Sequence, residues 1–239
     1  MFFPTFALLA LSSIFSYSGE IQLRTSDGCL LSAYENTVST ENPVILEIHG
    51  LGSDRKEWDR LNHFLEKERI NYLAIDLRGH GKSISCKGEK ADYRNFSEKD
   101  WGKITLDWEA GLKHLLKKFP RRLIIPAGAS IGANSAIIFS RDKKFSGLIL
   151  LSPGYNYAGL RPSEALAEIR SSMLFSYSPK DPYSAKSCSY FSKICFEKNL
   201  DCHFLEAESG HGVQIFKSSL GDDYASVIVK FIKALYTSK

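Results

Sequence analysis

No C-x-x-C pair occurs among the five cysteines of this 239-residue chain, so the spacing typical of zinc and thioredoxin-type sites is missing. No metal site is expected. Lysine and arginine form no extended basic block and the net charge is only +4, which argues against nucleic acid as a partner. The chain also lacks internal repeats, low-complexity tracts and linkers. Its composition, 44% hydrophobic and 24% charged, indicates one globular domain with a full core.

An odd number of cysteines leaves at least one thiol unpaired, whatever bridges the others form. Cys188 and Cys195 lie on a predicted helix, two turns or roughly 10 Å apart, too far to bridge each other. Burial as small apolar side chains is the simplest interpretation of all five, and their pairing stays open.

The first eighteen residues contain no charged side chain. Their apolar stretch, residues 6–15, has the length of a signal-peptide core and is too short to cross a bilayer, so no stable membrane span is expected. Ser16 and Ser18 place small residues before Gly19. We expect residues 1–18 to be a signal peptide and the domain 19–239 to be exported, whether secreted, periplasmic or lumenal. An uncleaved amphipathic lead-in or anchor is the alternative.

Short apolar runs alternate with helical patterns along the rest of the chain. The runs are continuously apolar, which is typical of parallel strands covered by helices on both faces, and an α/β fold follows. In such sheets ligands bind at the carboxyl ends of the strands. Strands are expected in 20–37 (a hairpin around Asp27-Gly28), 43–50, 123–129 and 145–154, the last of which ends in a Pro-Gly turn. The segments 70–83, 172–184 and 202–212 each begin as a strand and end as a loop. Helices are expected in 53–68 (with Ser53 as N-cap), 100–119, 162–170, 185–199 and 222–239.

The segment Gly128-Ala129-Ser130-Ile131-Gly132 follows one of these strands and opens into a helical pattern. A serine on such a strand-to-helix turn projects its hydroxyl from the sheet edge, and small flanking residues relieve the crowding around it. Ser130 is therefore the candidate nucleophile. A glycine-rich turn with a capping serine is the plainer interpretation.

Acyl-transfer chemistry also needs N–H donors aimed at the developing oxyanion. The tight turn His49-Gly50-Leu51-Gly52 ends the strand 43–50, at the same sheet edge as Ser130. We nominate the backbone N–H groups of Leu51 and Ile131, and we interpret His49 as structural.

A general base should follow the last strand. His211 meets this condition within Gly210-His211-Gly212, and Asp181 follows the preceding strand, 30 residues earlier. Asp201 begins a strand, at the opposite sheet edge. The remaining histidines are interpreted as structural, because the sequence places His63 and His114 on helices, His203 within a strand and His80 in a loop. Glu206 and Glu208 are the alternatives to Asp181 as the acid.

With these residues in the order serine, aspartate, histidine, the chain resembles the serine-hydrolase branch of the α/β-hydrolase superfamily, which includes esterases and lipases related to monoacylglycerol lipase and dienelactone hydrolase. The resemblance implies two-step acyl transfer through an acyl-enzyme on Ser130, a small-molecule acyl substrate and no cofactor. Oligomeric state stays open. The resemblance to this superfamily extends over residues 20–239. The motifs that support it are His49-Gly50-Leu51-Gly52, residues 76–83 (DLRGHGKS), the Ser130 segment, Asp181 and Gly210-His211-Gly212.

Many relatives insert a helical cap after the sixth strand, but only residues 152–170 are available here. This length predicts a short flap, with Tyr155, Tyr157 and Leu160 as candidate pocket contacts, and an open site. Carboxylic ester hydrolysis is the favoured activity. Peptide or amide hydrolysis on the same triad, or a non-catalytic binding role for the fold, are the alternatives.

Overall fold

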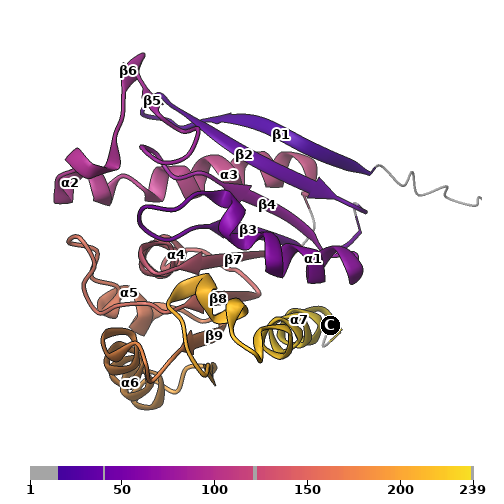
Figure 1. Cartoon of the computed structure of the whole chain (residues 1–239), viewed down its shortest axis with the longest axis vertical. Helices are drawn as coiled ribbons and strands as arrows, with labels where there is room; N and C mark the ends of the chain where they lie inside the picture. The colour runs from indigo at the N-terminus through magenta and orange to yellow at the C-terminus, as the bar shows by residue number, and fades with distance from the viewer. Residues whose placement is uncertain (1–15, 40, 121–122, 238–239) are drawn as a thin grey trace, which may run out of the picture.

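A ten-stranded, mostly parallel sheet forms the centre of the protein in a computed structural model that describes residues 16–39, 41–120 and 123–237 (Figure 1). The order is β10-β9-β8-β7-β3-β4-β2-β5-β6, with β1 paired to β2. Six neighbouring strands run parallel, which confirms the expected sheet: β3 (Val44–Ile48), β4 (Asn71–Ile75), β7 (Ile124–Ala129), β8 (Gly147–Leu151), β9 (Ser172–Tyr177) and β10 (Cys202–Glu206).

One end of the sheet is antiparallel. The expected hairpin around Asp27-Gly28 forms from β1 (Tyr17–Arg24) and β2 (Cys29–Thr37), and β5 (Ser85–Cys86) and β6 (Glu89–Lys90) extend this end. Residues 1–15 of the expected signal peptide lie outside the described residues. Its last residues, Tyr17 and Ser18, pair with Thr37 and Asn36 in β1, so cleavage before Gly19 would shorten this strand by two residues.

Helices cover both faces, and each face has its own apolar core. On one face Ile45 and Ile125 pack against α1 (Asp59–Lys67) and α7 (Gly221–Thr237). On the other, Leu46 and Ile48 belong to a core that includes residues of α3, α4, α5 and α6. The central strands β3, β4, β7 and β8 are thus buried on both sides, which explains the predominantly apolar runs there. The remaining helices are α2 (Glu98–Gly102), α3 (Thr105–Lys118), α4 (Ile131–Ser140), α5 (Ser163–Glu168) and α6 (Pro182–Glu197).

Several expectations need correction. The expected helix 53–68 begins with the 3₁₀ turn η1 (Arg55–Trp58), and its N-cap is Asp54, not Ser53, because the Asp54 side chain accepts the Lys56 N–H. The expected helix 100–119 is divided into α2 and α3. Four cysteines are not free apolar side chains but form the disulfides Cys29–Cys86 and Cys195–Cys202, and Cys188 is a buried thiol. No helix within the described ranges is long and apolar enough to cross a membrane.

Candidate active site

Ser130 lies on a sharp turn between β7 and α4. Its φ of 54° and ψ of −115° fall outside the regions that a residue with a side chain ordinarily adopts. The two flanking glycines permit this turn by close approach. A Cβ on Gly128 would lie 2.4 Å from the Gly132 backbone, and one on Gly132 would lie 2.4 Å from the Ile48 carbonyl oxygen. The turn is therefore packed against the end of β3, where the His49–Gly52 loop begins.

His211 and Asp181 meet at the neighbouring strand ends. The Nδ1 atom of His211 lies 2.5 Å from Oδ2 of Asp181. Asp181 is also the N-cap of α6, where its other oxygen accepts the Ser184 N–H at 3.3 Å, and the positive end of the helix stabilises the carboxylate. The pair therefore orients the ring so that Nδ1 faces Asp181 and Nε2 is free for another partner.

Ser130 and His211 line the same pocket, which has a volume of about 590 Å³. Leu51 and Tyr157 line it as well, and Leu51 is 43% exposed. Ile131 is buried, but it is the first residue of α4, so its N–H has no partner within the helix. Both nominated oxyanion donors thus belong to segments that meet at the Ser130 turn.

The other two expected pocket contacts lie elsewhere. Tyr155 lines a separate groove with Arg161 and Tyr190, and its ring lies 5.0 Å from that of Tyr183. Leu160 is buried, at 5% exposure, and its carbonyl accepts from Nδ2 of Asn134. Their place in the short flap made all three candidate pocket contacts, but only Tyr157 among them lines the Ser130 pocket.

Asn134 fixes the flap, residues 152–170, to the serine-bearing helix. Its side chain is fully buried one turn after Ser130. Oδ1 accepts the Gly154 N–H at 2.8 Å, and Nδ2 donates to the Leu160 carbonyl at 3.1 Å. One side chain therefore holds both ends of the loop that contains Tyr157.

Sequence reasoning missed two polar residues beside the site. Ser152, at the end of β8, accepts the Gly212 N–H at 2.8 Å and so fixes the turn that carries His211. Glu57, on η1, lines the Ser130 pocket and accepts the Gly50 N–H at 2.7 Å. Burial raises the pKa of Glu57, although the bonds from Ser53 and Gly50 favour its ionised form. Neither residue belongs to a motif, because each acts by accepting a backbone N–H, from Gly212 60 residues away for Ser152 and from Gly50 seven residues away for Glu57.

Two other motif residues support loops, as expected. His49 is buried; its Nε2 accepts the Leu77 N–H and its Nδ1 lies 2.7 Å from the Gly50 carbonyl. Burial lowers the pKa of His49 to about 3, so the ring is neutral at physiological pH. In the segment 76–83, the Asp76 carboxylate accepts the backbone N–H groups of Arg55 and Lys82 and the Arg55 guanidinium. This carboxylate therefore organises the loop.

The arrangement has the parts of a nucleophilic acyl-transfer site. A hydroxyl on a strained turn, an imidazole held by a carboxylate and N–H groups of two segments surround one open pocket. The described residues contain no group of three or more histidine, cysteine, aspartate or glutamate side chains suited to a metal ion.

The sequence matches the model of a family described as Serine aminopeptidase, S33, over residues 40–201. No curated protein sequence matches the chain significantly.

Solved structures share the fold over most of the chain. The esterase Pf2001 of Pyrococcus furiosus superposes with a TM-score of 0.76 at 19% identity, covering 92% of this chain and 90% of its own. The acylaminoacyl peptidase of Pyrococcus horikoshii gives 0.73 at 14% identity, covering 91% of this chain and 41% of its own. The esterase EaEST of Exiguobacterium antarcticum gives 0.71 at 14% identity, covering 90% and 100%. At these identities the likeness is one of fold.

Proposed function

This chain belongs to the Serine aminopeptidase, S33, family of α/β-hydrolases, and we propose that it hydrolyses carboxylic esters through an acyl-enzyme on Ser130. The observation that carries the proposal is the shared pocket. A serine in a left-handed turn and a histidine held by Asp181 at 2.5 Å line the same cavity. This constellation is recognised by geometry and role rather than by sequence position.

The proposed mechanism follows from which ring nitrogen of His211 carries the proton. The Asp181 carboxylate accepts a hydrogen bond from the protonated Nδ1 of His211, so Nε2 is the basic nitrogen that takes the Ser130 proton. The serine oxygen then attacks the ester carbonyl carbon, and the N–H groups of Leu51 and Ile131 stabilise the oxyanion. His211 returns the proton to the leaving alcohol. Water, activated by the same nitrogen, attacks the acyl-enzyme and releases the acid.

Ester hydrolysis is favoured over amide hydrolysis by the open pocket with a short flap and by two structural neighbours that are esterases. The family description and the P. horikoshii neighbour make peptide hydrolysis the second candidate. Hydrolysis of aminoacyl arylamides distinguishes the two candidate activities. An esterase turns over p-nitrophenyl acetate only, whereas an aminopeptidase also cleaves the arylamides.

The experiment is labelling of the folded protein with a fluorophosphonate. We expect rapid labelling that is lost in Ser130→Ala and His211→Ala and kept in Ser189→Ala, which changes an exposed serine on α6. Turnover of p-nitrophenyl acetate should fall by about 10⁴-fold or more in the first two variants, since such residues act as a unit. A folded protein that neither labels nor turns over this ester would instead be a binding module.

We also propose that the protein is exported. The apolar leader supports this proposal, and so do the disulfides Cys29–Cys86 and Cys195–Cys202, because disulfides persist in oxidising compartments. N-terminal sequencing of the mature protein tests it: a start at Gly19 is expected, and a start at Met1 would contradict cleavage.

A further inference from the structure

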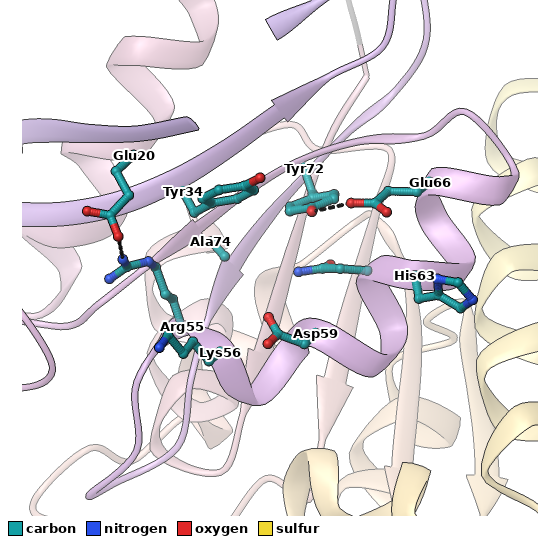
Figure 2. A pocket seen from close by; sticks show the side chains of 10 residues that line it. Glu20, Tyr34, Arg55, Lys56, Asp59, His63, Glu66, Tyr72 and Ala74 are labelled. Atoms are coloured by element: carbon teal, nitrogen blue, oxygen red, sulfur yellow. Dashed lines mark hydrogen bonds and ion pairs between the residues drawn. The ribbon is translucent and has the colours of Figure 1, made fainter. Parts of the chain in front are cut away.

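A second pocket, of about 420 Å³, lies on the α1 face of the sheet (Figure 2). It shares Lys56 and Asp59 with the lining of the Ser130 pocket. Its sheet side follows one row of paired residues: Glu20 lies opposite Tyr34, Tyr34 opposite Ala74, and Ala74 opposite Glu47. The helix side belongs to η1 and α1. The lining residues are Glu20, Tyr34, Arg55, Lys56, Asp59, Asn62, His63, Glu66, Tyr72 and Ala74.

The inner end of this pocket contains hydrogen-bond acceptors without donors. Asn62 lines the pocket at 4% exposure, and its Oδ1 atom has no partner among the described residues. Behind it, Glu47 is fully buried, and neither carboxyl oxygen has a hydrogen bond of ordinary geometry within the described chain. Ala74 is the neighbour of Glu47 in the adjacent strand, and it contributes only a Cβ atom to the pocket wall. A buried acceptor left unpaired costs about 1–3 kcal/mol, so the unpaired Oδ1 atom of Asn62 at the pocket wall requires an explanation.

The charges at the entrance are unevenly matched. Figure 2 shows Arg55 directed at Glu20, and its guanidinium also contacts Asp76 at 2.5 Å, so two carboxylates neutralise this cation. Asp59, in contrast, has no ion pair in the described part of the chain. Lys56 lies near enough to favour the ionised form of Asp59, but burial dominates and raises its pKa. Glu20 is also paired with Lys82 at 2.6 Å. The Asp59 carboxylate and the Asn62 Oδ1 atom are therefore the acceptors of the lining that are open to a cationic ligand.

The opposite wall is aromatic. The rings of Tyr34 and Tyr72 stack with centroids 6.3 Å apart, and both line the pocket in Figure 2. The hydroxyl of Tyr72 donates to Glu66 at 2.7 Å, which leaves the ring faces as the surface available to a ligand. Aromatic faces of this kind attract cations and pack against alkyl chains.

We propose that this pocket binds the protonated amino group of an organic amine. An ammonium group has three N–H donors and one positive charge, which match the Asn62 amide oxygen and the Asp59 carboxylate of the pocket lining, with the buried Glu47 carboxyl group behind Asn62. Its alkyl chain would lie against Tyr34 and Tyr72. Anionic ligands are disfavoured by the same acceptors, and a neutral alcohol supplies only one donor and no charge.

The state of Glu47 adds a second signature. Burial raises its pKa well above the ordinary value, despite the nearby Asn62 amide, and Asp59 raises it further. Its strand neighbours on either side, Ala74 and Ala127, do not titrate. Burial therefore favours the neutral form of Glu47, and a bound ammonium would favour the ionised form. Release of a proton on binding is therefore expected.

The test is calorimetric titration of the whole protein with n-butylammonium chloride, compared with 1-butanol. We expect saturable binding of the amine, at least about tenfold tighter than the alcohol, and at least about tenfold weakening in Glu47→Gln and in Asp59→Asn. Glu68→Gln removes the same charge from the C-terminal end of α1, outside the pocket, and should leave the affinity unchanged.

Equal affinity for amine and alcohol, absence of saturable binding, or full affinity in Asp59→Asn would each overturn the proposal. If Glu47→Gln does not fold, Asp59→Asn decides, because this side chain is at the surface. The titration detects no catalysis, so its outcome is independent of the role of Ser130.

Discussion

Glu57 provides the sharpest test of how the candidate oxyanion loop is held. In Glu57→Ala the Gly50 N–H loses the carboxylate that it contacts at 2.7 Å. An unpaired, partly buried donor costs about 1–3 kcal/mol of stability. Gly50 precedes Leu51, the proposed oxyanion donor, and loss of one such donor costs about 10²–10³-fold in rate. Glu57→Ala should shift the Leu51 N–H from its position without removing it, so we expect kcat to fall by about tenfold to a hundredfold.

Glu57→Gln is the matched control, because its amide oxygen can accept the same N–H. Its kcat should stay within about threefold of the wild type. The pH dependence separates charge from hydrogen bonding. Burial raises the pKa of Glu57 in the folded protein, so the stability contributed by its neutral form is complete below the ordinary carboxyl pKa of about 4.3 and is lost as the pH rises through the folded value. The Gln variant should therefore gain stability relative to the wild type as the pH rises.

Urea unfolding and p-nitrophenyl acetate turnover, both measured across pH, give the stability and the kcat of each variant and the pH dependence of both. If Glu57→Ala matched Glu57→Gln in both stability and kcat, the hydrogen bond to Gly50 would not position the loop. A loss of turnover in Glu57→Gln equal to that in Glu57→Ala would instead mean that the carboxyl proton itself is required.

Three further outcomes are expected. Gly132→Ala should lower stability by about 1–3 kcal/mol and abolish turnover, because its Cβ would lie 2.4 Å from the Ile48 carbonyl oxygen, whereas Gly102→Ala, with no atom within 4 Å, should do neither; equal stabilities would contradict the close packing. Ellman's reagent should detect no thiol in the folded protein and one per chain after unfolding without reductant, because burial raises the pKa of Cys188 to about 12; rapid reaction of the native protein would refute this. Glu35→Gln should lose about 2–3 kcal/mol near neutral pH: burial alone would raise the pKa of Glu35, but bonds from its neighbours outweigh burial and lower it to about 2. This difference should shrink as the pH falls from about 5 toward 2, and a constant difference in acid unfolding would exclude the charge as its cause.

The sequence predicted most of the fold because local rules and the global fold agree. Continuous apolar runs such as 147–151 required burial on both faces, and the core residues on each side bear this out. The serine turn was predictable for the same reason, since two close backbone approaches both require glycine.

What could not be predicted depends on register. Cys29 and Cys86 are 57 residues apart, and only the pairing of β2 with β5 makes them neighbours. The unpaired position of Glu47 likewise depends on which residues flank it in adjacent strands. A single sequence states which side chains are polar, but not which backbone groups meet them.

The two hydrogen bonds of Asn134 also indicate where this fold can accept inserted residues. Gly154 and Leu160 are held to α4 by a buried side chain, so the five residues between them form a loop with fixed ends. Each doubling of a flexible loop adds only about 0.6 kcal/mol to its closure cost. Additional residues can therefore be inserted here, above the pocket that Tyr157 lines, while the helix that begins at Ser130 stays in place. The flap is the point at which a new substrate-contacting segment could be added to this scaffold at little cost in stability.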